Sequence, residues 1–307
     1  MAGTHRLRQG HQHPRDGRLS LLARRYDIMS LTAPMDSDLP IGVFDSGIGG
    51  LSVLRHICAH LPNEHLLYFA DSGFAPYGGK PREWIVARSL GIAEFLLGQG
   101  AKALVVACNT ATAASIKALR ERYPELPVVG VEPGLKPAAA ISKSGKVGVL
   151  ATERTLASDK FRLLREQTSA ATDVEFLAQA CKGLADQVEK GELHSPATMV
   201  LLNQYVTPLL QQGADTLVLG CTHYPFVQPA IESLVRQVTQ QPVAIIDTGA
   251  AVARQLGRLL EQHALRRQAS APGTLRAFTT GSPSTLARAF EALLHLHPEV
   301  TAIETGA

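Results

Sequence analysis

The feature that most restricts the fold of this chain is a duplicated pattern of short apolar runs. From residue 40 onward these runs alternate with helical stretches, a pattern typical of parallel sheets flanked by helices. They form two sets of four, starting at residues 41, 66, 103 and 128 and then at 147, 174, 216 and 243, with spacings of 25, 37 and 25 against 27, 42 and 27. Four runs that match in register predict a duplicated domain rather than a solenoid.

We therefore predict an α/β protein with two pseudo-symmetric three-layer domains, mostly parallel sheets, and an active site in the cleft between the domains. A length of 307 residues fits two domains. The predicted first domain is discontinuous, comprising residues 40–135 and 250–307, and the second comprises residues 136–249. The C-terminal part of the chain is expected to pack on the first domain through a helix, a strand, a helix and a last apolar run, at 250–260, 275–280, 284–296 and 300–303.

Composition and charge exclude several classes of protein. With 45% hydrophobic residues, 19% charged residues and a formal net charge of +3, the chain is typical of a globular protein without the broad basic surface that nucleic acids or membranes require. No apolar run reaches the ~18 residues of a membrane span. Residues 1–39 are rich in Arg, His and Gln, and we predict a disordered basic extension. A transit segment, or a start codon assigned too early, remains an alternative.

Cys108 and Cys221 occupy equivalent positions in the two repeats. Each follows the third run of its set and precedes a predicted helix, at 111–122 and at 227–239. Because ligands bind beyond the carboxyl ends of parallel strands, two such domains packed about a pseudo-twofold axis would bring both thiols to one cleft. The four cysteines show neither a CxxC pair nor a Cys/His metal spacing, and no signal peptide is evident. We expect free thiols, no metal site and a cytoplasmic protein.

Two facing thiols suit the inversion of a stereocentre that carries an acidic hydrogen. Such a reaction needs a base on one face of a planar carbanion and a proton donor on the other. The reference pKa of cysteine, ~8.5, falls at helix N-termini, and we expect the predicted helix starts to favour the thiolate of both residues. A single cysteine at a strand end is more often a small buried hydrophobe. The paired positions favour catalysis.

Polar residues next to the thiols are candidates for holding a substrate. Backbone amides and short polar side chains at a helix start can bind carboxylates. Asp45 could orient or deprotonate a substrate ammonium or the neighbouring thiol, and His223 could do the same beside Cys221, although each has structural uses as well. The glycines after Asp45 match no nucleotide-binding motif and more simply allow a tight turn and close backbone approach. The further candidates in these segments are Ser46, Asn109, Thr110, Thr112, Thr222 and Tyr224.

Five motifs resemble the glutamate racemase family: FDSGIGGLSVL, ADSGFAPYG, VVACNTATA, GCTHYP and IDTGAAVA, in this order over about residues 40–300. The resemblance implies cofactor-independent interconversion of L- and D-glutamate, which supplies D-glutamate for peptidoglycan. By motif match it implies that Cys108 and Cys221 are the catalytic pair, the first usually working on the D-enantiomer and the second on the L-enantiomer. It also implies substrate contacts at Asp45, Ser46, Tyr77, Gly78, Asn109, Thr110, Thr222 and His223.

One segment departs from the family pattern. Residues 180–189 read ACKGLADQVE, where many members have ACPLFVPLVE, so both prolines are missing. Glu189 is a further candidate because it matches the family's glutamate in this segment. Cys181 has no evident chemical partner, and we interpret it as structural.

Three competing functions remain open on the sequence alone. The first is an aspartate racemase or another amino-acid racemase of the same superfamily. Aspartate differs from glutamate by one methylene, and a methylene contributes only ~1–3 kcal/mol to the discrimination between substrates in a pocket. The combination of CNTA, CTHYP and PYG favours glutamate. The second is a redox protein with a reversible disulfide, and the third is a two-lobed binding protein without catalysis. The only partner we predict is a small-molecule substrate; the oligomeric state is open, and a homodimer is one of the states compatible with the sequence.

Overall fold

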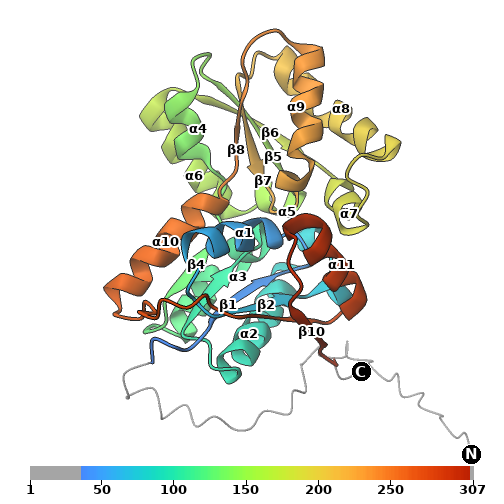
Figure 1. Ribbon diagram of the computed structural model, residues 1–307. Helices are drawn as coiled ribbons and strands as arrows, with labels where there is room; N and C mark the ends of the chain where they lie inside the picture. Colours follow the sequence, from blue (N-terminus) through green and yellow to red (C-terminus); the bar gives the residue numbers. More distant parts are fainter. Residues whose placement is uncertain (1–35, 305–307) are drawn as a thin grey trace, which may run out of the picture.

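The computed structural model describes residues 36–304. They form two domains, each built on one sheet whose strands all run parallel (Figure 1). The first sheet has the strand order β10-β9-β2-β1-β3-β4, and the second has the order β6-β5-β7-β8. Most of the extension predicted at residues 1–39 lies outside the described residues.

The central strands are continuous apolar runs, because helices cover both faces of each sheet. All five residues of β1 and of β2 are buried. The first sheet contains β1 (Ile41–Asp45), β2 (Leu66–Ala70), β3 (Ala103–Val106), β4 (Val128–Gly130), β9 (Leu275–Thr279) and β10 (Glu299–Ala302). The second contains β5 (Lys146–Ala151), β6 (Glu175–Ala180), β7 (Thr216–Gly220) and β8 (Ala244–Ile246).

The two sheets repeat one strand order. In each set of four, the first strand along the chain lies between the second and the third, and the fourth lies outside the third: β2-β1-β3-β4 and β6-β5-β7-β8. The predicted fold class, two related α/β domains with parallel sheets, is confirmed. Beyond β2 the first sheet is extended by β9, which pairs with β2, and by β10. The domain boundaries at 135/136 and 249/250 stay predictions.

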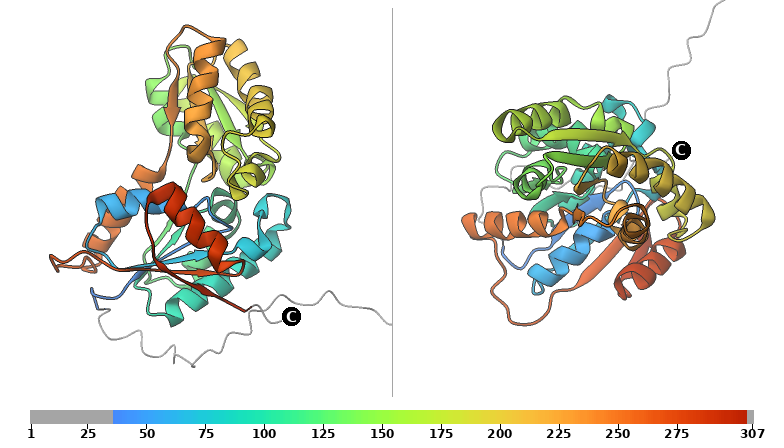
Figure 2. Two further views of the ribbon diagram at one scale, coloured as in Figure 1. Left: turned by 45° about the vertical axis from the view of Figure 1, so that its right-hand side comes forward. Right: turned by 90° about the horizontal axis from the view of Figure 1, so that it is seen from above.

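Helices cover both faces of each sheet. In the first domain α1, α10 and α11 lie on one face of the sheet, and α2 and α3 pack together on the other (Figures 1 and 2). In the second domain α8 packs on α9, and α4 packs on α6 across the sheet. The longer helices are α1 (Leu51–His60), α2 (Arg82–Gly98), α3 (Asn109–Arg122), α6 (Asp159–Thr172), α8 (Pro196–Gln211), α9 (Gln228–Val238), α10 (Gly249–Gln262) and α11 (Pro283–Leu294). The shorter ones are α4 (Leu135–Ile141), α5 (Glu153–Leu156) and α7 (Leu184–Glu189), with 3₁₀ turns η2 (Ser72–Phe74), η3 (Tyr77–Gly79) and η4 (Tyr224–Val227).

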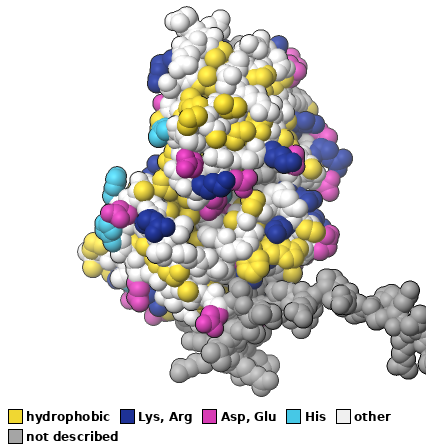
Figure 3. Space-filling view, turned by 90° about the vertical axis from the view of Figure 1, so that its right-hand side faces the viewer, with side chains coloured by type: hydrophobic (Ala, Val, Ile, Leu, Met, Phe, Trp, Pro, Cys, Tyr) yellow, Lys and Arg dark blue, Asp and Glu magenta, His cyan; other side chains and the backbone are white. Residues whose placement is uncertain are grey.

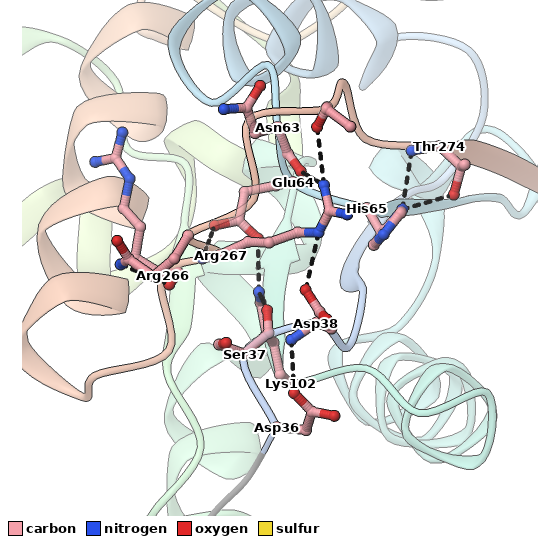
Figure 4. A network of polar contacts seen from close by, with 12 residues as sticks. Asp36, Ser37, Asp38, Asn63, Glu64, His65, Lys102, Arg266, Arg267 and Thr274 are labelled. Atoms are coloured by element: carbon pink, nitrogen blue, oxygen red, sulfur yellow. Dashed lines mark hydrogen bonds and ion pairs between the residues drawn. The ribbon is translucent and has the colours of Figure 1, made fainter.

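A buried polar network ties together the amino ends of the first three strands (Figure 4). The fully buried Lys102 donates from Nζ to Glu64 Oε2 over 2.6 Å. Arg267 donates its backbone amide to Glu64 Oε1 over 2.9 Å and its Nε to Asp38 Oδ1 over 3.0 Å. This network stands at the opposite end of the sheet from the carboxyl ends of the strands, where parallel sheets bind ligands.

The surface carries charges of both signs. On the face shown in Figure 3, Lys and Arg side chains are interspersed with Asp and Glu, and apolar side chains are visible on both domains. Within residues 36–304, no helix combines the length and apolar character needed to cross a membrane. Across the same range, no group of three or more His, Cys, Asp and Glu side chains is arranged to hold a metal ion.

Candidate active site

Cys108 lies where β3 ends and α3 begins. It is the N-cap residue of α3, with extended backbone, and its Sγ accepts a hydrogen bond from Ala111 N over 3.4 Å. The predicted helix start is therefore confirmed for this thiol. The helix predicted at 227–239 is also present, as α9 from Gln228, but the expectation that Cys221 stands where it begins is wrong, because the turn η4 lies between them. Pro229 has no amide hydrogen to continue a helix from the preceding turn, so the helix restarts with Pro229 in its first turn.

The surroundings of Cys108 are acidic and buried. Ser46 Oγ lies 3.6 Å from Cys108 Sγ. The fully buried Asp45 accepts hydrogen bonds from Ser46 N over 2.7 Å and from Gly50 N over 2.5 Å. Burial raises the pKa of Asp45, and although the charge of His223 lowers it, the pKa stays above its ordinary value. Burial and the charge of Asp45 also raise the pKa of Cys108 well above its ordinary value. The expectation that the helix start favours the Cys108 thiolate is wrong, because one amide hydrogen bond does not offset burial beside a carboxylate.

Cys221 has a basic partner instead. Its Sγ lies 3.6 Å from Nδ1 of His223, whose Nε2 is 2.6 Å from Glu189 Oε1. Burial lowers the pKa of His223, but the hydrogen bonds to Cys221 and Glu189 outweigh burial and hold that pKa well above its ordinary value. Burial raises the pKa of Glu189, and its bond to His223 outweighs this and lowers the pKa. The two thiols are thus held in opposite electrostatic surroundings.

A glycine-rich loop after β1 carries the contact between the two domains at this point. Ile48 N donates to Glu189 Oε1 over 2.8 Å. A Cβ atom on Gly47 would lie 1.8 Å from Glu189 Oε1, and one on Gly49 would lie 2.3 Å from Nδ1 of His223. The predicted close backbone approach is confirmed, and its reason is space for the side chains of the second domain.

The other predicted substrate contacts line the same boundary. Gly78, in η3, faces α5, where an added Cβ would lie 3.5 Å from Thr152 Cβ. Thr110 Oγ1 lies 3.0 Å from Thr152 Oγ1. The buried Thr222 accepts a hydrogen bond at its carbonyl from Ser52 Oγ over 2.7 Å. The contacts of Thr110 and Gly78 with Thr152 join α3 and η3 to the second domain, and the contact of Thr222 joins the end of β7 to α1 of the first domain.

Asn109 has unused hydrogen-bonding capacity. It follows Cys108 directly and is 4% exposed. Neither Nδ2 nor Oδ1 of its side chain has a hydrogen-bond partner among residues 36–304. Buried amides are nearly always paired, so this group is suited to a bound polar ligand.

The charges of the site act between the two domains. The charge of His223 lowers the pKa of Asp45, and that of Cys221 raises the pKa of Cys108. Residues from both halves of the duplication therefore meet beyond the carboxyl ends of the two sheets, as the repeat predicts. Which of them bind substrate or carry protons stays a prediction at this point.

Comparison with known proteins decides the family. The family model described as Asp/Glu/Hydantoin racemase matches residues 41–256. The chain belongs to this racemase family. It is 60% identical over 229 residues to the glutamate racemase of Ectopseudomonas mendocina, covering 75% of this chain and 85% of that relative. It is 52% identical over 248 residues to the glutamate racemase of Pseudomonas aeruginosa strain PAO1, covering 81% and 91%.

Solved structures of racemases share the fold. Glutamate racemase isoform RacE1 from Bacillus anthracis aligns with a TM-score of 0.77 at 32% identity, covering 87% of this chain and 98% of that chain. The Escherichia coli glutamate racemase, in complex with L-glutamate and the activator UDP-MurNAc-ala, aligns with a TM-score of 0.75 at 31% identity, covering 88% and 100%. Membership of a racemase family decides against a redox protein and against a binding protein without catalysis.

The sequence reasoning missed one feature of this racemase, a buried ion pair next to Asp45. Asp71 ends the strand next to β1 and accepts hydrogen bonds from Arg88 and Tyr77. The sequence does contain a signal that Asp71 lies near Asp45, because Asp71-Ser72-Gly73 repeats Asp45-Ser46-Gly47 at the end of the neighbouring strand. The arginine is 17 positions away and no motif links it to the aspartate.

Proposed function

We propose that this protein interconverts L- and D-glutamate by a two-thiol mechanism that needs no cofactor. The observation that carries the proposal is the placement of Cys108 and Cys221 at equivalent ends of two duplicated sheets, each beside a group able to exchange a proton. The substrate assignment is supported by relatives at 52–60% identity that are glutamate racemases. The D-glutamate formed supplies peptidoglycan.

Proton transfer passes between the two thiols through the substrate. One thiol, as thiolate, takes the Cα proton from one face, and the other thiol gives a proton to the opposite face of the carbanion. Each turnover leaves the first thiol protonated and the second ionised, so the reverse reaction uses the same groups in exchanged roles. His223, held by Glu189, stabilises the thiolate of Cys221, while Asp45 can accept the proton of Cys108 and return it.

The polar residues of the cleft hold the amino acid in place. Asn109 supplies an unpaired amide, and Thr110, Thr222 and the backbone of Tyr77 and Gly78 supply short donors for the two carboxylates. Ser46 lies against Cys108 and is suited to orient the substrate ammonium together with Asp45. Free thiols persist in a reducing compartment, so we assign the enzyme to the cytoplasm. A homodimer stays a prediction.

The proposal is tested by incubating the purified protein with each enantiomer of glutamate, and of aspartate, in D₂O without added cofactor. We expect L- and D-glutamate to converge on an equal mixture with deuterium at Cα, and aspartate to react far more slowly. Cys108→Ser and Cys221→Ser should each lower the rate by at least about 1,000-fold, on the scale of losing a nucleophile or base. Cys58→Ser, a half-buried thiol in α1, is the matched control and should retain the rate.

Two results would count against the proposal. Turnover of aspartate but not glutamate would assign the enzyme to the aspartate racemases. Undiminished racemisation by either of the variants Cys108→Ser and Cys221→Ser would remove the two-thiol mechanism, whatever the substrate.

A further inference from the structure

Asp71 lies at the carboxyl end of β2, one strand away from Asp45. Its amide donates to the carbonyl of Asp45 over 3.0 Å, and its side chain is fully buried. Both carboxylate oxygens are saturated. Oδ1 accepts from Arg88 Nη2 over 2.5 Å and from Thr280 Oγ1 over 2.8 Å. Oδ2 accepts from Arg88 Nε over 2.7 Å and from Tyr77 Oη over 2.5 Å.

Hydrogen bonds to Asp71 restrain the loop of residues 72–80 at two points. The loop begins directly after Asp71, and Tyr77 in its second half donates from its hydroxyl to the Asp71 carboxylate. Between them the Arg88 guanidinium lies 4.0 Å from the centroid of the Phe74 ring. Tyr77 itself is 1% exposed and packs edge-on against Trp84 with centroids 5.5 Å apart. The loop therefore has little freedom to move without breaking the ion pair.

The contacts between Asp71 and Arg88 have the geometry that makes a buried ion pair stable. Desolvation of two charges is costly unless the contact is well aligned and every remaining lone pair is used. Arg88 forms the two-pronged contact that lysine cannot form, and Tyr77 and Thr280 use the remaining lone pairs. A pair meant only to stabilise the fold could be replaced by apolar packing. The loop held by this pair carries Gly78, which lies against Thr152 of the second domain.

We propose that the Asp71–Arg88 ion pair is a positioning device that holds Tyr77 and Gly78 in place to bind the substrate carboxylate. The inference rests on the proposed function, since it assigns these two residues to the substrate. Asp71 and Arg88 touch neither thiol and act through the loop. Loosening the pair therefore weakens substrate binding more than it slows proton transfer.

The test compares two buried carboxylates of the same sheet. Asp71→Asn neutralises the pair beside the cleft, and Glu64→Gln neutralises the pair with Lys102 at the opposite end of the strands (Figure 4). Both variants should lower the melting temperature, because each leaves a buried cation unpaired. Only Asp71→Asn should raise KM for glutamate, and only it should speed amide hydrogen exchange of the peptide spanning residues 72–80.

Milder variants cover the case in which Asp71→Asn does not fold. Arg88→Lys keeps the charge and loses the two-pronged contact, and Tyr77→Phe removes one donor to Asp71. Each should raise KM about tenfold, as expected for one lost hydrogen bond, with kcat reduced less than about threefold. Because both act through Asp71, their effects on KM in the double variant should fall short of the product of the two.

The outcomes separate this inference from the proposed function. If the wild-type protein does not racemise glutamate, the proposed function fails. If the wild-type protein racemises glutamate but folded Arg88→Lys and Tyr77→Phe keep its KM, the positioning role is refuted. An equal rise of KM in Glu64→Gln, or a fall of kcat at unchanged KM, would also refute it, since the first indicates a purely structural role and the second a role in proton transfer.

Discussion

Gly49→Ala places a methyl group against the imidazole of His223. A Cβ atom at residue 49 would lie 2.3 Å from Nδ1 and 2.4 Å from Cε1 of that ring. Non-bonded heavy atoms keep about 3.5 Å apart, so the ring or the loop must move by roughly 1 Å. The backbone of Gly49 is outside the left-handed region, so steric overlap with the ring is the only obstacle to an alanine. The ring is 5% exposed and held by Glu189 at 2.6 Å, so it cannot turn out into solvent.

The displacement acts on turnover more than on stability. Overpacking of one methyl costs about 1–3 kcal/mol of folding free energy, which a two-domain protein tolerates. A shift of about 1 Å moves Nδ1 away from Cys221 Sγ, now at 3.6 Å, and such misplacement can cost about 100-fold in rate. We therefore expect kcat to fall about 100-fold in a folded protein. Because the two enantiomers have equal free energy in water, kcat/KM must fall by the same factor in both directions.

The assay follows racemisation from each enantiomer by circular dichroism, together with thermal unfolding. Gly98→Ala in α2 is the control, because among residues 36–304 no heavy atom lies within 4 Å of its Cβ position, apart from its chain neighbours and the backbone of its own helix. Gly98→Ala should leave the racemisation rate unchanged and raise the free energy of unfolding by about 0.5–1 kcal/mol. In a His223→Ala background, Gly49→Ala should add little, since the group it displaces is gone. Wild-type turnover by folded Gly49→Ala, or its full effect in that background, would refute the reasoning.

Three further predictions concern stability. The pKa of His223 is raised above its ordinary 6.5. Its charge therefore stabilises the fold at low pH, and this contribution is lost as the pH rises through the raised pKa. The difference in melting temperature between wild type and His223→Asn should shrink from pH 6 upward. Hydrogen bonds, Ser142 Oγ among them, outweigh burial and lower the pKa of Asp215 to about 2, so acid titration between about pH 4 and 2 should destabilise wild type more than Asp215→Asn. Phe290 is fully buried and lies edge-on to Tyr68 with centroids 5.6 Å apart; Phe290→Ala should cost about 3–5 kcal/mol in urea unfolding, and a loss under about 1 kcal/mol would contradict that packing.

Elements whose signal is local were predictable from the sequence. The strands β1 and β5 are apolar runs bounded by polar or glycine-rich segments, and burial on both sheet faces requires that pattern wherever it occurs. The start of α3 at Cys108 was also close, within two residues of the predicted helix. The start of α9 was also predicted to within one residue, but the 3₁₀ turn η4, which contains Pro225, separates it from Cys221, and apolar periodicity does not reveal that turn.

Electrostatic partners were not predictable, because they depend on which segments meet in space. His223 and Glu189 are 34 positions apart, and Asp71 and Thr280 are 209 apart. Glu189 became a candidate through resemblance alone, and its bond to His223 appeared only in the structure. The same holds for Cys108, whose expected tendency to ionise at a helix start is reversed by burial beside Asp45.

The sequence by itself determined the duplicated α/β architecture, the two thiols at equivalent strand ends and the family that their flanking motifs resemble. These follow from short-range patterns, since strand, turn and motif residues lie next to one another in the chain. Only the tertiary structure decided that one thiol faces Asp45 and the other His223, and that Asp71 and Arg88 hold the loop carrying Tyr77. Charge and burial act through space, and two symmetric positions in a sequence acquire different chemistry from the side chains that folding brings beside them.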